Sequence, residues 1–159
     1  MARNKNALRK HYIQPYVEGE EYDEEGWLRL ARYITTIGVE PNEETEEEAF
    51  YDGDGTPEET VTSVARAYSP EGQFDPEDDA QALIETLQYK IGDERKVWHK
   101  VVRSDGKKEW IGRATVLDIV AGAGDASEFE EFSCTIRFDE KPKVEDLGNG
   151  DGGDGGVEG

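Results

Sequence analysis

The stretch GDASEFEEFSCTIRFDEKP, residues 124–142, decides the fold class of this chain. An acidic, glycine-containing turn leads into a run that ends in a second acidic turn closed by Pro142. From Phe132 to Phe138 every second residue is apolar or cysteine, and the residues between them are polar. This is the period of a β-strand with one buried face. The stretch contains no plausible active site, so it predicts a strand made for packing.

The composition bounds the function. A chain of 159 residues fits one domain with a core of ordinary depth. The net charge of −20 argues against a conventional nucleic-acid binder, which needs a basic surface. The charge is uneven: residues 1–14 carry basic residues and no acids, whereas residues 15–60 carry 16 acids and two bases. Two interpretations of residues 1–14 are open: a basic arm that pairs with acidic residues, or a solvated terminus.

The cysteine content and the N-terminus indicate a reducing compartment. Cys134 is the only cysteine, so an intrachain disulfide is excluded. The basic N-terminal residues are followed by no apolar segment of the kind found in secretion signals. We therefore expect the protein to be made and kept in a cytoplasm.

One helix is predicted over residues 75–88. Asp75 is a suitable N-cap, Pro76 fits the first helical position, and acids follow at the positive end of the helix dipole. An apolar stripe with helical spacing then predicts that the helix packs on a sheet. The predicted core comprises this stripe and the face of the 132–138 strand: Leu83, Ile84, Leu87, Phe132, Ile136 and Phe138.

The other predicted elements are strands. Residues 27–39 form a strand with apolar groups on both faces, and residues 60–68 form a second one after an acidic hairpin loop at 40–60. Residues 96–103 and 109–120 form a hairpin around an Asp-Gly turn. We expect five or six mainly antiparallel strands, arranged as a β-sandwich or open barrel with one flanking helix.

The predicted organisation has three parts. Residues 1–25 form an N-terminal arm, residues 26–143 form the β domain with its long hairpin loop, and residues 144–159 form a flexible tail rich in glycine and aspartate.

Candidate chemistry is weak. The many acids lie in expected turns, where a solvated surface is a better interpretation than a catalytic pair. The Asp52–Gly55 turn begins like a calcium loop, but Ser63 stands where the twelfth-position glutamate is required. Cys134 and His99 would make a nucleophile and a base, yet a buried lone cysteine is usually structural. We predict no catalytic residue, no metal site and no cofactor.

The order of these elements resembles the major tail (tail tube) proteins of long-tailed bacteriophages. The likeness extends from about Trp27 to Pro142 and rests on residues 74–87, 97–119 and 129–138. It implies a small β-sandwich with a flanking helix, a long hairpin loop and mobile terminal arms. It also implies a structural virion protein that forms hexameric rings, which stack into the tube used for genome ejection.

The resemblance further implies partners and a location. The partners are further copies of the chain, a tape-measure protein in the lumen, and tail terminator and distal tail proteins, while genomic DNA passes without specific binding. The protein would reside in the virion tail after assembly in the host cytoplasm. Contacts between rings are expected from the basic arm and the acidic hairpin: Arg3, Lys5, Arg9, Lys10, Glu46, Glu47, Phe50 and Tyr51.

Two other classes stay open. An acidic DNA mimic would occupy the basic nucleic-acid site of another protein, although its charges should then follow one surface instead of loops and tails. A small hydrolase would use the acids or Cys134.

Overall fold

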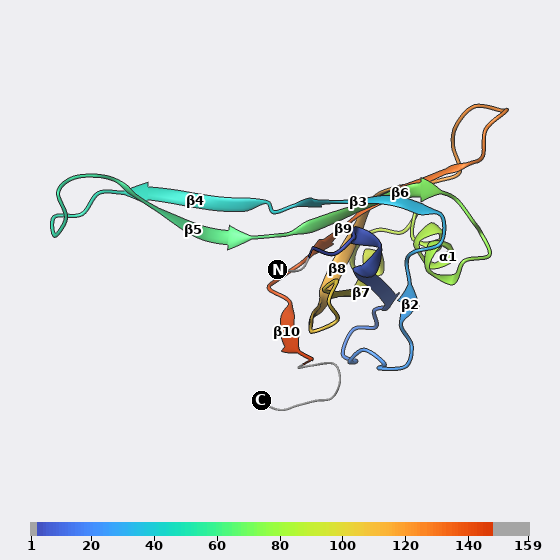
Figure 1. Ribbon diagram of the computed structural model, residues 1–159, viewed down its shortest axis with the longest axis horizontal. Helices are drawn as coiled ribbons and strands as arrows, with labels where there is room; N and C mark the ends of the chain where they lie inside the picture. Colours follow the sequence, from blue (N-terminus) through green and yellow to red (C-terminus); the bar gives the residue numbers. More distant parts are fainter. Residues whose placement is uncertain (1–2, 148–159) are drawn as a thin grey trace.

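The computed structural model describes residues 3–147, which form one strongly curled antiparallel sheet with a helix on its flank and a long projecting hairpin (Figure 1). The strands of the sheet are β1 (Lys10–Pro15), β2 (Leu28–Arg29), β3 (Ile34–Glu40), β6 (Ala67–Gln73), β7 (Lys96–Val102), β8 (Lys108–Ala121), β9 (Glu131–Phe138) and β10 (Lys143–Asp146). Their order is β2-β1-β7-β8-β9-β6-β3, and β10 also pairs with β8. The mainly antiparallel fold with one flanking helix is confirmed, in the open-barrel form.

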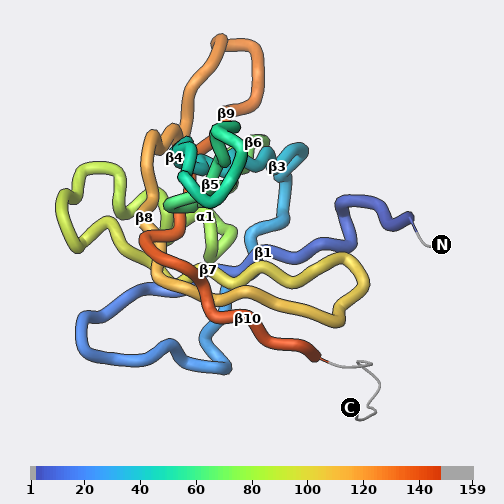
Figure 2. The backbone as a smooth tube through the Cα atoms, turned by 90° about the vertical axis from the view of Figure 1, so that its left-hand side faces the viewer, coloured from blue at the N-terminus to red at the C-terminus, as the bar shows by residue number. Residues whose placement is uncertain are grey.

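The remaining strands form the projecting hairpin. β4 (Glu43–Glu48) and β5 (Glu58–Val64) pair with each other only, and they continue the β3–β6 pair away from the body. Seen along the hairpin, the sheet curls around a central space that side chains fill (Figure 2). The sequence analysis predicts fewer strands for two reasons. It merges neighbouring strands, since residues 60–68 span the end of β5 and the start of β6, and it predicts no strand at β1 or β10.

β8 is the longest strand and organises the sheet. Its first half pairs with β7 through the predicted Asp-Gly turn, where Gly106 has a φ of 74°. Its second half pairs with β9, with an irregularity near Asp118, which has a φ of 52°. β10 lies beside the first half of β8, on the side opposite β7. β8 therefore has a strand partner along nearly its whole length, and it has partners on both sides around residues 109–111 and 114–115.

The core lies on one face of the sheet. On β9, Phe132, Cys134, Ile136 and Phe138 are each no more than 3% exposed, while Arg137 is exposed. Val97 and Val101 of β7 and Ala114 and Val116 of β8 extend the same apolar layer.

The helix α1 (Asp79–Thr86) covers this layer, but it begins later than predicted. Asp78 is the N-cap and accepts a hydrogen bond from the Gln81 amide. Asp75 accepts instead from the Glu77 amide in the preceding turn. Ile84 and Leu87 are buried, whereas the predicted core residue Leu83 is only half-buried. The structure thus buries five of the six predicted core side chains.

Three further expectations differ from the structure. Residues 10–15 were assigned to an N-terminal arm, but they form β1 between β2 and β7. The predicted strand over residues 27–39 is divided into β2 and β3, and Tyr33 between them has a φ of 62°. The predicted tail at residues 144–159 begins in β10, and its residues 148–159 lie outside the described residues.

A close backbone contact explains the division at Tyr33. The chain passes directly over Gly72 of β6, where a side-chain methyl group would overlap the Tyr33 carbonyl oxygen. The Gln73 amide donates to that same oxygen at 2.9 Å. Gln81, fully buried, donates to the carbonyls of Arg32 and Gln73 and so fixes the helix against this bend.

Because Ile84 and Leu83 differ in burial, alanine substitutions at these two neighbouring helix residues should reduce the free energy of unfolding by different amounts. Ile84→Ala should lower the free energy of unfolding by about 2–5 kcal/mol, because it opens a cavity in a closed core. Leu83→Ala is the matched control and should cost clearly less, because that side chain is only partly buried and packs at the margin of the core. Urea unfolding followed by tryptophan fluorescence measures both, and equal losses would contradict the described packing.

Candidate assembly surfaces

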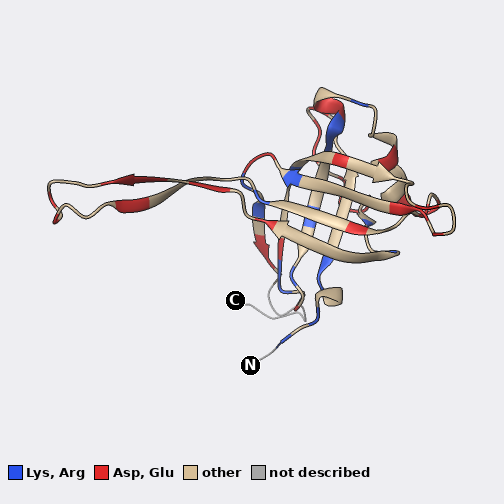
Figure 3. Ribbon diagram, turned by 90° about the horizontal axis from the view of Figure 1, so that it is seen from above, with Lys and Arg blue, Asp and Glu red and all other residues tan. Residues whose placement is uncertain are grey.

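The β4–β5 extension is the most unusual surface of the molecule. Every residue of both strands is exposed, and the extension projects well beyond the sheet (Figures 1 and 3). Phe50 is 51% exposed, and the Tyr51 side chain at the tip is fully exposed. A two-stranded hairpin without a buried face is marginally stable in water. The extension is therefore a surface that would gain stability from a partner.

The charge of the extension adds to this instability. Residues 41–65 contain nine acids and no base, and Figure 3 shows the acids along both strands. Glu47 lies directly opposite Glu59, and Glu48 lies opposite Glu58. Like charges in directly opposed positions destabilise a strand pair. Cations from elsewhere would relieve this repulsion.

A second surface, here called the root groove, lies where the extension leaves the body. It is a hollow of about 660 Å³ whose walls include apolar Tyr68, Trp110 and Phe138 and cationic Arg9, Arg66 and Lys141. Glu140 is the one acid in its lining. A neighbouring hollow of about 540 Å³ shares Arg9, Arg66 and Tyr68 and adds Arg29. Within residues 3–147, none of the side-chain nitrogens of Arg9, Arg66 and Lys141 lies within 4.0 Å of a carboxylate oxygen.

The predicted contact residues occupy separate places in one molecule. Arg3, Lys5 and Lys10 are exposed, and Arg9 lines the root groove. Glu46 and Glu47 lie on β4, and Phe50 and Tyr51 lie at the tip. The structure thus brings Arg9 into a defined site and leaves the basic and acidic groups of one copy apart.

The edges of the sheet form a third surface. β3 pairs only with β6, so the outer backbone groups of this seven-residue strand have no strand partner in the described chain. Its sequence, ITTIGVE, has no charge before the last residue, and Val39 is 46% exposed. At the opposite end, β2 has only two residues and leaves part of β1 uncovered. Uncharged open edges favour pairing with another chain.

The second face of the sheet is partly covered. Trp98 of β7 contacts Tyr16 and Tyr22, with ring centroids 5.4 and 5.5 Å apart, and Lys100 lies over Trp27 at 4.9 Å. The segment between β1 and β2 therefore packs on the sheet instead of extending as an arm. Sequence reasoning missed this packing, although the spaced aromatic residues were its signal.

The rest of that face is polar. Ser133, Thr135 and Arg137 of β9 lie there, beside Thr115 of β8. Burial raises the pKa of Asp139, but hydrogen bonds from Thr115 at 2.6 Å and Lys96 at 2.9 Å outweigh it, so the pKa is lowered. This network fixes Lys96, Thr115 and Asp139 beside the polar face of β9.

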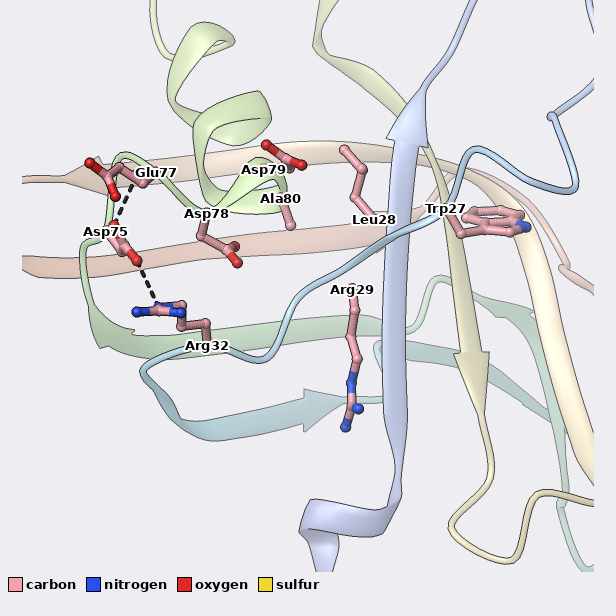
Figure 4. Close-up of a pocket in the computed structure, with 9 residues that line it drawn as sticks. All are labelled: Trp27, Leu28, Arg29, Arg32, Asp75, Glu77, Asp78, Asp79 and Ala80. Carbon is pink, nitrogen blue, oxygen red and sulfur yellow. Dashed lines mark hydrogen bonds and ion pairs between the residues drawn. The ribbon is translucent and has the colours of Figure 1, made fainter.

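A hollow at the start of α1 is an ordinary surface depression. Asp75 lies between Arg32 and Glu77, and it pairs with Arg32 at 2.9 Å (Figure 4). The Arg32 side chain is 62% exposed, so this ion pair contributes little stability. Asp78 and Asp79 complete an acidic rim that we interpret as helix capping.

Cys134 and His99, which were considered as a nucleophile and a base, are both buried. Burial raises the pKa of the Cys134 thiol to about 12, which removes its nucleophilic form at neutral pH. Within residues 3–147 no cluster of three or more His, Cys, Asp or Glu side chains is placed to hold a metal ion. In the described part of the chain, neither α1 nor the two 3-10 helices, Asn6–Leu8 and Gly92–Arg95, has the length and apolar character of a membrane span.

His11 and His99 form a buried pair. His11 Nδ1 lies 3.3 Å from His99 Nε2, and the His99 ring stacks on Phe138 with centroids 5.2 Å apart. His99 Nδ1 has no hydrogen-bond partner among residues 3–147. Burial, and then Arg9, lowers the pKa of His11 to about 4; burial, and then His11, lowers that of His99. Both rings are therefore neutral parts of the core at neutral pH.

Comparison with known proteins identifies the fold. No protein-family model and no curated protein matches the sequence. Among solved structures, the tail of an empty GTA particle with C6 symmetry is similar, with a TM-score of 0.65, 15% identity, and coverage of 91% of this chain and 99% of that chain. The tube-terminating cap of the anti-feeding prophage is similar at a TM-score of 0.54 and 12% identity, covering 92% and 93% of the two chains.

A third similarity is lower. The sheath–tube complex of an extracellular contractile injection system aligns at a TM-score of 0.48 and 11% identity, over 86% of this chain and 88% of that chain. The class defined by the first two comparisons is a tail-tube fold. The chain shares this fold with the components of a tail and of a tube cap found in these two structures.

The histidine pair predicts a specific pH dependence. Between pH 6.5 and about 4 the unfolded chain protonates these rings and the folded protein does not, so folding stability falls as the pH falls through this window. The lowered pKa of His11 alone should reduce the free energy of unfolding by roughly 3 kcal/mol across this window, at 1.4 kcal/mol per pKa unit.

The measurement compares the wild type with the double variant His11→Phe, His99→Phe by urea unfolding at several pH values. Carboxylate titration is common to both proteins and cancels in the difference. The free energy of unfolding of the wild type should fall relative to that of the variant as the pH is lowered from 7 to 4. A difference that is constant from pH 7 to pH 4 would show that the histidines are not buried and neutral.

Proposed function

We propose that this protein is a tail tube protein of a long-tailed phage or phage-derived particle, in which six copies close a ring and rings stack into a hollow tube. The observation that carries the proposal is the fold similarity, over 91% of the chain, to the tail of a particle with C6 symmetry. The open edge of β3 and the exposed extension supply two surfaces that need a second chain, as such an assembly requires.

The two surfaces suit two directions of contact. Pairing of β3 with an uncovered edge of a neighbour would join sheets within a ring and remove open edges, which otherwise favour aggregation. The extension would reach a neighbour in the next ring. Under this assignment, the predicted contacts are those between the basic residues Arg3, Lys5, Arg9 and Lys10 and the acidic hairpin.

The charge fits a conduit for DNA. A net charge of −20 gives a surface that repels a polyanion, so a genome would slide through the tube without binding. The proposal includes a tape-measure protein in the lumen, terminator and distal tail proteins at the ends, and residence in the virion tail after assembly in the host cytoplasm.

The alternative of an acidic DNA mimic gains no support from the comparisons. The densest acids follow a thin two-stranded extension, whereas a mimic needs them over one broad surface that fits a basic site.

Removal of the extension tests the proposal. The Asn42 and Ala65 backbones are hydrogen bonded, so residues 43–64 can be replaced by an Asn-Gly turn at that point. Because every residue of β4 and β5 is exposed, the variant should keep its melting temperature and cooperative unfolding. It should not form long tubes.

The assay follows wild type and variant by sedimentation velocity and negative-stain microscopy at increasing concentration. Wild-type rings or tubes with sixfold symmetry are expected. A wild type that stays monomeric at high concentration would overturn the proposed function. Long tubes from the folded variant would overturn the role of the extension.

A further inference from the structure

We propose that the root groove binds the hairpin tip of a second copy of this chain. The Phe50–Tyr51 pair would enter the apolar floor, and the neighbouring acids would face Arg9, Arg66 and Lys141. This inference rests on the proposed function, because it assumes that copies of the chain assemble, and it adds the site that receives the extension.

The tip has the features of an inserted group. Tyr51 is fully exposed and Phe50 is half-exposed, at the end of strands with no buried residue. Aromatic side chains are the commonest anchors of protein interfaces when they fill a pocket on the partner. Glu48 and Glu58 are directly opposed beside the tip and repel each other. Cations at the pocket rim would lie close to both carboxylates and reduce this repulsion.

The groove has the complementary features. Its floor contains Tyr68 and Phe138, which are 6% and 3% exposed, so the pocket is backed by the rigid core. Its rim carries three cations that have no ion-pair partner among the described residues, in a protein with a net charge of −20. Arg66 and Lys141 thus offer a local positive field that an acidic, aromatic segment would match.

The tip cannot enter the groove of its own chain. Val64, at the base of β5, lines the groove and pairs with Glu43, whereas Tyr51 lies eight residues further along the hairpin. At 3.3 Å per residue this separation is roughly 26 Å. Figure 1 shows the extension leading away from the body. The occupant must therefore be another copy, displaced along the hairpin direction.

This contact joins two different surfaces. Tip and groove are chemically unlike, so the interaction is heterologous: in a bound pair, one copy still has a free groove and the other still has a free tip. Such a contact can repeat from copy to copy, which matches the stacking assigned to the extension. A nucleic acid or free anion in the groove would explain the cations but not the apolar floor or the exposed aromatic tip.

A crosslinking experiment tests the contact directly. Full-length Gly53→Cys protein, with the thiol beside Tyr51 in the tip, and Glu140→Cys protein, with the thiol in the groove lining, are mixed under mild oxidation and separated on a non-reducing gel. A disulfide-linked heterodimer should form, because the groove brings the two positions together. The native Cys134 is 3% exposed and should stay unreacted. Asp125→Cys, in the distant β8–β9 loop, replaces Glu140→Cys as the matched control at an exposed acid and should give at least about tenfold less product.

Substitutions give the second readout. Tyr51→Ala should raise the critical concentration for assembly by about tenfold or more, as loss of an aromatic anchor does at interfaces. Arg66→Glu should do the same. Tyr89→Ala is the matched control for an exposed tyrosine, at 91% exposure outside both surfaces, and should have no effect.

The outcomes separate the two proposals. Tubes that form in wild type without the specific crosslink, and that are insensitive to Tyr51→Ala and Arg66→Glu, would overturn this inference and leave the proposed function standing. The crosslink without any ring or tube would support the contact and overturn the tube. Binding of a short DNA duplex that is lost in Arg66→Glu, with no crosslink, would assign the groove to nucleic acid and overturn the inference.

Discussion

The structure depends on the backbone pairing of β8. This strand is hydrogen bonded to β7 and β10 along its first half and to β9 along its second half, so it links the two ends of the sheet. Its alternation places Ala114 and Val116 in the core beside Val97 and Ile136, and α1 closes over that layer. Once β8 is paired in this way, the β3–β6 hairpin is left at one end of the sheet with nowhere to bury its extension.

Much of the sheet was predictable because its signals are local. The alternation in β9 and the Asp-Gly turn between β7 and β8 each lie within a few residues, and both led to the correct elements. β1 was missed because its buried residues include His11 and Gln14, which hydropathy treats as exposed. Gln14 is satisfied by hydrogen bonds to the Asp23 backbone, a loop contact that sequence alone cannot supply.

The assembly surfaces also differ in how far the sequence predicted them. The extension was predicted from one continuous acidic stretch with Phe50 and Tyr51 in it. The root groove was not, because it gathers Arg9, Arg66, Trp110 and Lys141 from four distant parts of the chain. The late start of α1 has a simpler cause: Asp75 and Asp78 are both competent caps, and the contacts of Gln81 decide between them.

The placement of tip and groove at opposite ends of the hairpin has a consequence for any assembly built with that contact. Such an assembly has a direction, and its two ends are chemically distinct. One end presents acidic loops tipped with aromatic residues, and the other presents empty cationic hollows. Proteins that start the assembly and proteins that stop it must then carry opposite complements, one a groove and the other a tip, so each can bind only at its own end.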